Sequence, residues 1–453
     1  MKNVKFICTQ SIVYNMRGAY IPRIIDGQVD KAMQMYGAAL IEGPKWCGKT
    51  RTAEEHSRSA LFIKDAAAQS SIRMAIETGS SSFLVGDDPR LIDEWQTVPE
   101  IWDLVRHEVD HDWDRRFILT GSSVPPELST NHSGAGRFAH IRMRTMSLFE
   151  SGESDGAVSL AGLFEGGRVD SHTDADLDDY VHAIIRGGWP MAVMRGHATD
   201  PCFAHDYLDT IVDMDMPRMF RGVFFEEMDD LGNVRRETGR DRAVRAVTRR
   251  AMQSISRNLA TAAPVSTILD DVNGQGCIVS MPTFRKYLEF MRGMFILEGL
   301  EAWNPHVRST SRLHSKPKWH FTDPSIAAAS LGVGEGGLKT DPRALGLFFE
   351  SLCLRDLRVY IQGLGGNVYY LGTHSGYEVD LIVELPDGRW GAMEVKLGSS
   401  DHERAASNLL RLDDLVDMKR AGDPAFRAIL TGTQFGHTRK DGVHVIPLGC
   451  LGP

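Results

Sequence analysis

The eight residues GPKWCGKT at positions 43–50 constrain this chain most, because they match the pattern GxxxxGK[ST] and stand between an apolar run and a helical stretch. Glycines allow the curvature that points backbone N–H groups at phosphate oxygens, and the helix that follows adds a positive dipole end. In this pattern Lys49 reaches the β and γ phosphates, and the Thr50 hydroxyl is a ligand of Mg²⁺. The sequence therefore predicts a site for ATP or ADP made by Gly43, Pro44, Lys45, Trp46, Cys47, Gly48, Lys49, Thr50 and Arg51.

Two further apolar runs end in polar residues that suit such a site. RLIDEW at 90–95 ends in a carboxylate pair, in which Asp93 would hold Mg²⁺ and Glu94 would activate the attacking water as general base. FILTGSS at 117–123 ends in hydroxyl groups, and ligands of open α/β sheets lie beyond the carboxyl ends of the strands. Thr120 or Ser122 would then sense the γ-phosphate, although a plain strand-to-turn transition explains these residues equally well.

An arginine finger would complete the site by stabilising the charge that develops during phosphoryl transfer. Arg137 in GAGRFAHIRMR is the first candidate, and Arg142 and Arg144 compete with it. Each arginine taken singly is also compatible with a solvated surface charge.

The composition sets the class of protein. The net charge of -9 gives no general hint of nucleic acid or an anionic membrane, so only a local basic patch would support such a partner. No two of the six cysteines have CxxC spacing, which favours reduced thiols used in packing. We find no signal peptide and no run of about 18 apolar residues. We therefore expect a cytoplasmic protein without a membrane partner.

The pattern of apolar runs divides the chain into four parts. Strand-like runs alternate with amphipathic segments in the first part, which favours a parallel sheet covered on both faces; its strand candidates are 38–43, 81–86, 90–95 and 116–122. Residues 151–180 are rich in Gly, Ser and Asp, which indicates a linker or mobile surface segment. The four parts are an ATPase domain at 1–150, an acidic linker and helical region at 151–250, a winged-helix-like domain at 251–335 and an α/β domain at 336–453.

The winged-helix prediction depends on two capping residues and two strand-like runs. Ser266 and Ser280 would begin the second and third helices. The runs MFILEGLEAW and KPKWHFTD would form the wing.

These residues together resemble prokaryotic AAA+-type ATPases that carry a DUF4143 C-terminal region. The segments that carry the resemblance are YIPRIID (20–26), IEGPKWCGKT (41–50), LIDEWQTVPEIWDLVR (91–106), LTGSS (119–123), GAGR (134–137), RGGWP (186–190), FTDP (321–324) and GYEVDLIVE with EVKLG (376–398). The resemblance implies an AAA-like P-loop core, a helical and winged-helix middle and a restriction-endonuclease-like C-terminal α/β domain. It also supports Arg137 as a nucleotide-site arginine.

A second candidate site lies in the C-terminal part. Asp380 in YEVDLIVE, with Glu394 and Lys396 in MEVK, forms the D…ExK arrangement of PD-(D/E)xK nucleases. Residues 394 and 396 point to one face of their strand, and Glu350 on the preceding helix would complete the cluster. Glu350, Asp380 and Glu394 would bind a metal that activates water, and Lys396 would orient that water. A half-buried hairpin with alternating charges gives the same pattern, so an inactive domain is the alternative.

A basic segment is a candidate surface for binding DNA. RRETGRDRAVRAVTRR at 235–250 and the pair Arg285 and Lys286 would contact DNA phosphates. Alternatively, the arginines form a salt-bridged face with Glu226, Glu227, Asp229 and Asp230.

Three functions remain open at this point. The first is an ATP-dependent switch or motor with nuclease activity on DNA, the second is an ATP-regulated DNA-binding module, and the third is a STAND-type switch whose partner is a protein. A homo-oligomer would place Arg137 in the site of a neighbouring subunit.

Overall fold

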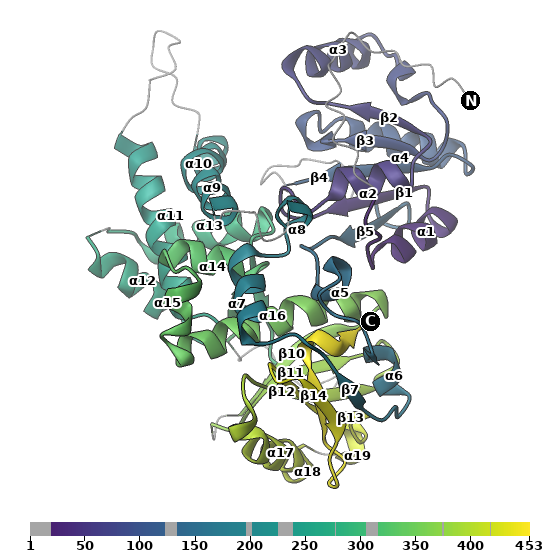
Figure 1. The fold of residues 1–453 in the computed structure, drawn as a ribbon. Helices are drawn as coiled ribbons and strands as arrows, with labels where there is room; N and C mark the ends of the chain where they lie inside the picture. The colour runs from purple at the N-terminus through teal and green to yellow at the C-terminus, as the bar shows by residue number, and fades with distance from the viewer. Residues whose placement is uncertain are drawn as a thin grey trace.

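The computed structural model describes residues 20–122, 134–195, 202–224, 239–276, 278–304, 316–373, 376–416 and 418–453. Its N-terminal unit, at the upper right of Figure 1, is a sheet in the order β2-β3-β4-β1-β5, and every neighbouring pair is parallel. The strands predicted at 38–43, 90–95 and 116–122 are thereby confirmed. The five strands are β1 (Ala38–Glu42), β2 (Ser59–Phe62), β3 (Arg90–Asp93), β4 (Phe117–Gly121) and β5 (Phe138–Arg142).

The strand predicted at 81–86 is wrong. Ser82–Leu84 form the short 3-10 helix η1, in which Leu84 is buried, and Val85 after it is 69% exposed. The edge position beside β3 belongs to β2 instead.

Helices cover both faces of this sheet, because successive strand residues point to opposite sides. Leu40 belongs to the apolar cluster with the third and fourth helices, and its neighbour Ile41 belongs to the cluster with the first and second. These helices are α1 (Asp26–Met35), α2 (Lys49–Glu55), α3 (Ala66–Glu77) and α4 (Ile101–His111).

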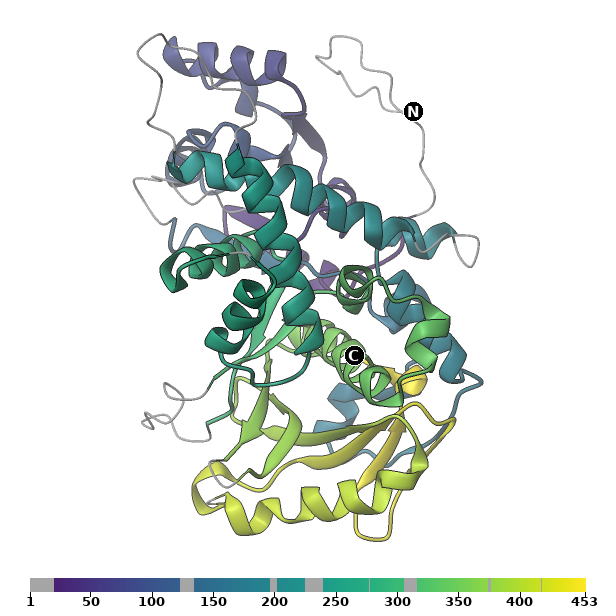
Figure 2. The ribbon, with the colours of Figure 1, turned by 90° about the vertical axis from the view of Figure 1, so that its left-hand side faces the viewer.

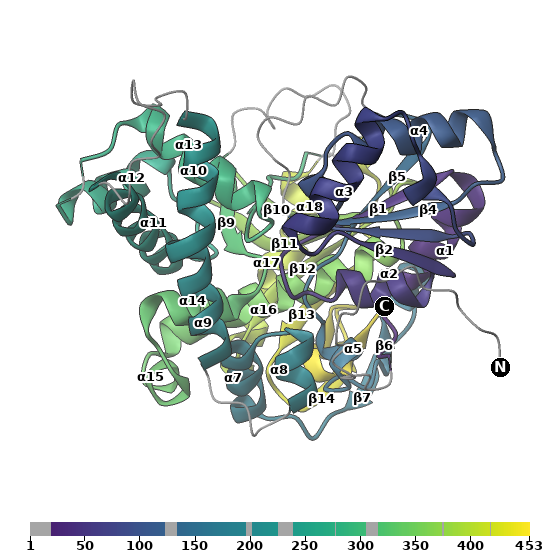
Figure 3. The ribbon, with the colours of Figure 1, turned by 90° about the horizontal axis from the view of Figure 1, so that it is seen from above.

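A helical unit follows and lies between the N-terminal and C-terminal units in Figure 2. In Figure 3 its helices stand beside the N-terminal sheet. It contains α7 (Leu177–Arg186), α8 (Pro190–Arg195), α9 (Cys202–Thr210), the π-helix η4 (Ile211–Asp215), α10 (Met216–Phe224), α11 (Gly239–Arg257), α12 (Val265–Gly274), α13 (Met281–Gly293), α14 (Pro324–Leu331) and α15 (Glu335–Lys339).

The helices α11, α12 and α13 are followed by an antiparallel strand pair, β8 (Leu297–Leu300) and β9 (Lys318–Phe321). This is the order expected of a winged helix, and that assignment stays a prediction. Ser280 caps α13 through the backbone N–H of Thr283, as expected. Ser266 does not cap α12, because that helix already begins at Val265 after Pro264.

The C-terminal unit is a seven-stranded sheet in the order β10-β11-β12-β13-β15-β14-β7. The long helix α16 packs on one face, and α17 packs with the apolar side chains of the other. Its elements are α16 (Pro342–Gly363), β10 (Asn367–Gly372), β11 (Glu378–Glu384), β12 (Trp390–Lys396), α17 (His402–Leu410), α18 (Leu412–Leu415), α19 (Met418–Ala421), β13 (Phe426–Thr431), β14 (Phe435–Thr438), β15 (His444–Pro447) and β16 (Leu451–Gly452).

The structure corrects the linker interpretation of residues 151–180. β7 (Asp170–His172) pairs with β14, and β6 (Val158–Ser159) pairs with β16, so this segment adds strands to the C-terminal unit. Its acidic residues gave a loop-like composition, but Val158 and Val169 between them are buried. Two short helices complete the segment, α5 (Leu148–Ser151) and α6 (Leu160–Phe164).

Two other expectations concern the membrane and the thiols. In the ranges given above, every helix is too short or too polar to span a bilayer. Cys47, Cys353 and Cys450 are buried free thiols, which fits their use in packing. Cys8 and Cys277 lie outside the described residues.

Candidate functional site

The GxxxxGK[ST] loop turns directly from β1 into α2. Gly48 has φ of 109°, a left-handed conformation that glycine adopts without strain, and Trp46 also has a positive φ of 65°. Gly43 is needed for a different reason, since a Cβ atom there would lie 2.1 Å from the carbonyl oxygen of Met143. Lys49 is the first residue of α2 and donates hydrogen bonds to the carbonyls of Gly43 (2.9 Å) and Pro44 (2.7 Å).

Hydroxyl groups from two elements converge on one carboxylate beside this loop. Thr50 Oγ1 donates to Asp93 Oδ1 over 2.8 Å, and Thr120 Oγ1 donates to the same oxygen over 2.5 Å. Asp93 ends β3 and Thr120 lies in the adjacent strand β4, in register with it. Hydroxyl and carboxylate oxygens are the ligands that Mg²⁺ prefers, so these residues fit the ion that the loop pattern implies.

Glu94 has a conformation that is rare for a residue with a side chain. Its φ of 60° and ψ of 40° lie in the left-handed region. Residues with a side chain that adopt such strained backbone angles cluster at functional sites. Gln96 Nε2 donates to Glu94 Oε2 over 2.5 Å, and Thr97 Oγ1 donates to the Glu94 carbonyl over 2.8 Å. The carboxylate is therefore held in place and half-exposed beside Asp93.

A cavity of about 750 Å³ opens over these residues, which is within the size range of ligand pockets. The predicted site residues that line it are Lys45, Trp46, Gly48, Lys49, Thr50, Arg51, Asp93, Glu94 and Ser122. Thr120 lies just behind Asp93, and Cys47 is fully buried with its thiol directed at the Met143 carbonyl. The roles of these residues stay predictions, but the fold brings them together.

Sequence reasoning missed several residues of this cavity. Tyr20 and Arg23 before α1, and Met191 and Met194 of α8, also line it. Tyr20 and Arg23 belong to YIPRIID, and Met191 and Met194 follow RGGWP; both segments entered only as carriers of the family resemblance, since no local pattern shows that they approach the loop.

The helical unit also touches the loop directly. Lys45 Nζ lies 2.7 Å from Asp215 Oδ1 in η4, and the Asp215 side chain is only 9% exposed. The loop is thus tied by an ion pair to a segment about 170 residues away in the sequence.

Arg137 does not belong to the ATP site of its own chain. It precedes β5, which runs parallel to β1, and so lies at the amino ends of the strands. The nucleotide loop follows β1 and so lies at the carboxyl ends. A strand of five residues spans about 16 Å. The Arg137 side chain is 43% exposed and pairs with Asp110 over 2.8 Å. The structure thus separates Arg137 from the loop of its own chain, and its role as an arginine finger from a neighbouring subunit stays a prediction.

Arg142 and Arg144 are also occupied elsewhere. Both pair over 3.1 Å with Glu298 of β8, and Arg358 of α16 pairs with the same carboxylate over 3.0 Å. Burial alone would raise the pKa of Glu298, but the charges of these three arginines hold it well below its ordinary value. They form a junction of the three units rather than an arginine finger.

The predicted C-terminal cluster does assemble. Lys396 Nζ lies 2.7 Å from Glu394 Oε2 and 3.2 Å from Asp380 Oδ2, and the backbone N–H of Val395 donates to Asp380 over 2.8 Å. Asn408 of α17 donates to the other oxygen of Glu394. Burial and the charge of Asp380 raise the pKa of Glu394 to about 7.

A second lysine enters this cluster from outside the C-terminal unit. Lys318 of β9 is almost fully buried and pairs with Glu350 over 3.3 Å and with Glu378. Burial alone would lower the pKa of Lys318, but the charges of Glu350, Glu378 and Asp380 raise it. No local pattern linked residue 318 to a cluster that begins at residue 350.

These lysines bear on the predicted metal site. In the described parts of the chain, no group of three or more His, Cys, Asp or Glu side chains is placed to hold a metal ion. Lys318 and Lys396 pair with these carboxylates, and the metal-ligand role of Glu350, Asp380 and Glu394 stays a prediction.

The arginines of the basic segment are partly paired. Arg249 of α11 lies 2.8 Å from Asp209, and Arg245 lies 3.9 Å from Asp213. This supports the salt-bridged alternative, with acidic partners other than the predicted ones. Those partners, Glu226, Glu227, Asp229 and Asp230, lie outside the described residues. Arg285 is exposed at the start of α13.

Comparison with known families supports the two ends of the chain. Residues 36–151 match the model of an AAA domain and residues 345–451 match DUF4143, a domain of unknown function. The family resemblance drawn from the sequence is thereby confirmed. Residues 177–336 match a further domain of unknown function, DUF8612.

Two solved structures are similar over most of their own length. A Walker-type ATPase of Pyrococcus abyssi has 14% identity and a TM-score of 0.38, covering 67% of this chain and 94% of its own. The Orc1 protein of Aeropyrum pernix, solved in complex with DNA, has 11% identity and a TM-score of 0.21, covering 69% and 94%. A comparison with curated proteins found no match.

Proposed function

We propose that this protein binds ATP with Mg²⁺ and hydrolyses it to switch the arrangement of its helical and C-terminal units. The observation that carries the proposal is the convergence of Thr50 and Thr120 on Asp93, next to Lys49 and under a cavity of nucleotide size. The confirmed AAA domain over residues 36–151 supports it.

Each residue has a role that follows from its chemistry. Backbone N–H groups of the loop and the Lys49 ammonium bind the phosphates. Thr50 and Asp93 would hold Mg²⁺, which neutralises charge on the phosphate oxygens. Glu94 accepts a proton from the attacking water, and its bonds to Gln96 and Thr97 fix the position from which it does so.

Replacing Lys49 by methionine should weaken ATP binding. The variant keeps the length of the side chain but removes the charge, and a hydrogen bond to a charged group contributes about 1.5–3 kcal/mol, so we expect at least a roughly tenfold rise in Kd. Titration with a fluorescent ATP analogue measures this. Lys31→Met, on the exposed face of α1, is the matched control. Equal affinity in all three proteins would contradict the proposed site.

For the C-terminal unit we propose a binding or assembly role without cleavage. Lys318, which comes from the preceding unit and is not part of the D…ExK pattern, already pairs with Glu350 and Glu378. This observation favours the switch with an inactive C-terminal domain over the nuclease.

Incubation with labelled DNA tests that choice. With Mg²⁺ or Mn²⁺, and with or without ATP, neither the wild type nor Asp380→Asn should cut DNA. Cleavage by the wild type that the variant lacks would restore the nuclease hypothesis.

The same samples discriminate the class of partner. Binding of DNA that weakens steeply with salt would favour contact of Arg285 and α11 with phosphates. Lack of binding at low salt would favour a protein partner.

A further inference from the structure

Arg23 is a buried arginine beneath the nucleotide loop, and the proposed function gives it no role. It stands before α1 in YIPRIID, it is 7% exposed, and it lines the wall of the cavity. A Cβ atom added to Gly48 would lie 3.3 Å from Arg23 Nη1, so the guanidinium is packed against the loop itself.

One bond of Arg23 fixes a peptide group of the loop. Arg23 Nη1 donates to the carbonyl oxygen of Cys47 over 2.9 Å. That carbonyl belongs to the peptide that joins Cys47 to Gly48. Because a trans peptide is planar, its C=O and N–H groups point in opposite directions. Holding the Cys47 carbonyl on the Arg23 side therefore directs the Gly48 N–H away from Arg23.

The other donors of Arg23 are bound to a rigid anchor. Arg23 Nε donates to Glu150 Oε1 over 3.0 Å, and Nη2 donates to the Arg144 carbonyl over 2.9 Å. The Glu150 side chain is 2% exposed and also accepts hydrogen bonds from the backbone N–H groups of Ile24 and Ser147. A buried carboxylate with all these partners has little freedom to move.

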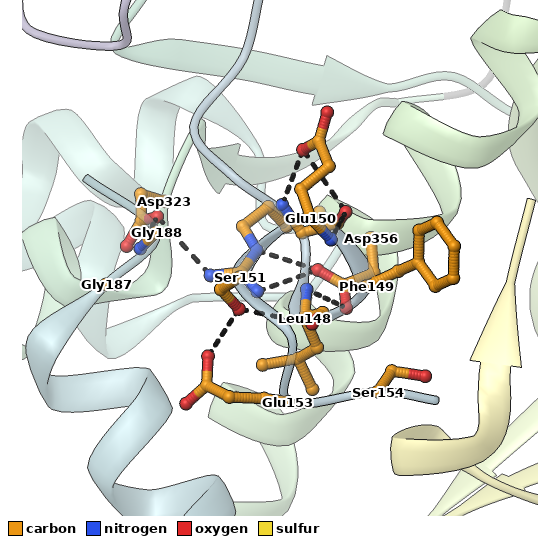
Figure 4. Close-up of polar contacts among 12 residues, drawn as sticks. Leu148, Phe149, Glu150, Ser151, Glu153, Ser154, Gly187, Gly188, Asp323 and Asp356 are labelled. Atoms are coloured by element: carbon orange, nitrogen blue, oxygen red, sulfur yellow. Dashed lines mark hydrogen bonds and ion pairs between the residues drawn. The ribbon is translucent and has the colours of Figure 1, made fainter. Parts of the chain in front are cut away.

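The anchor is in turn held by the C-terminal unit. Figure 4 shows α5 from Leu148 to Ser151, with the N–H of Leu148 bonded over 3.0 Å to Asp356 of α16. The N–H of Phe149 donates to the Tyr360 hydroxyl over 3.3 Å. Arg23 can therefore shift only if the loop or this junction shifts with it.

We propose that Arg23 is a positioning residue of the ATP site, which orients the Gly48 N–H toward the phosphates by holding the Cys47 carbonyl against the α5 anchor. The inference rests on the proposed ATP site. The role needs arginine, because a lysine ammonium is a single point charge that cannot reach Cys47, Glu150 and Arg144 together.

Arg23→Lys tests the inference, with Arg186→Lys as the matched control. The Arg186 side chain is also only 8% exposed and binds one carboxylate, Glu153, through both Nη atoms (2.9 and 2.7 Å), but among the described residues its hydrogen bonds and ion pairs do not involve the loop. Arg23→Lys should raise the KM for ATP roughly tenfold, the factor expected from one charged hydrogen bond. Its kcat should stay within about twofold, because an interaction made equally in the ground and transition states changes KM alone.

The control separates positioning from stability. Both variants should lower the thermal midpoint, since each loses a buried charged pair, but only Arg23→Lys should change KM. If Arg23→Lys does not fold, Glu150→Gln replaces it, because it loosens the same anchor without touching the loop; its KM should also rise.

The outcomes are distinct. A wild-type protein that neither binds nor hydrolyses ATP would remove the proposed function. An active wild type with an unchanged KM in Arg23→Lys, or in Glu150→Gln if that variant is used, would overturn the role of Arg23 alone.

Discussion

Replacing Glu94 by glutamine should leave ATP bound and nearly stop its hydrolysis. The amide has the size of the carboxylate but cannot accept the proton of the attacking water. General-base catalysis contributes typically about 10²–10⁴-fold, so we expect kcat to fall by at least about 100-fold. The Kd for ATP should change little, since Lys49, Thr50 and Asp93 remain in place.

The measurement is steady-state phosphate release beside equilibrium binding of an ATP analogue. Glu100→Gln is the matched control, because Glu100 is exposed and precedes α4 in the same region of the domain. Wild-type turnover in Glu94→Gln would remove Glu94 from the catalytic role, whereas loss of both binding and turnover would indicate damage to the site.

The parts of this site that sequence predicts are those that local geometry determines. The loop at 43–50 needs its glycines because of one positive φ and one close approach, and both constraints leave a mark in the pattern. Asp93 and Thr120 were found because parallel strands bring their carboxyl ends to one edge.

Contacts between segments that are far apart in the sequence leave no local pattern of this kind. Arg23 reaches the loop only because α5 folds back beneath it, and Lys318 reaches Glu350 only because β9 packs against α16. Arg137 is the opposite case, because it follows β4 closely in the sequence but lies at the amino ends of the strands, away from the nucleotide loop.

Composition misled the interpretation of residues 151–180 for a similar reason. Gly, Ser and Asp are typical of loops, yet β6 and β7 are short strands whose partners, β16 and β14, lie near the end of the chain. Pairing with strands roughly 260–300 residues away overrides local preference and cannot be seen in a window of a few residues.

Replacing Glu298 by glutamine should be among the most destabilising single changes in the molecule. Its carboxylate is 8% exposed and joins β5, β8 and α16 through Arg142, Arg144 and Arg358. Removing one partner of a buried ion pair costs about 3–5 kcal/mol, because the remaining charge is left uncompensated. Here three guanidinium groups would remain, and burial already lowers the pKa of Arg358 to about 10.

Urea denaturation followed by tryptophan fluorescence measures this loss, with Glu301→Gln as the matched control. Glu301 is exposed and follows β8 in the sequence, so its replacement should change stability by less than about 0.5 kcal/mol. A loss below about 1 kcal/mol in Glu298→Gln would mean that the three arginines find solvent or other acceptors, and that the junction is not held by this carboxylate.

The pH dependence of the stability of the wild type and of Glu298→Gln gives an independent check. The folded-state pKa of Glu298 is depressed, so its contribution is complete above the unfolded-state pKa of about 4.3 and is lost as the pH falls through the lower folded-state value. The stability difference between the wild type and Glu298→Gln should therefore be full at neutral pH and shrink in acid. A constant difference down to strong acid would show that shape rather than charge at residue 298 stabilises the junction.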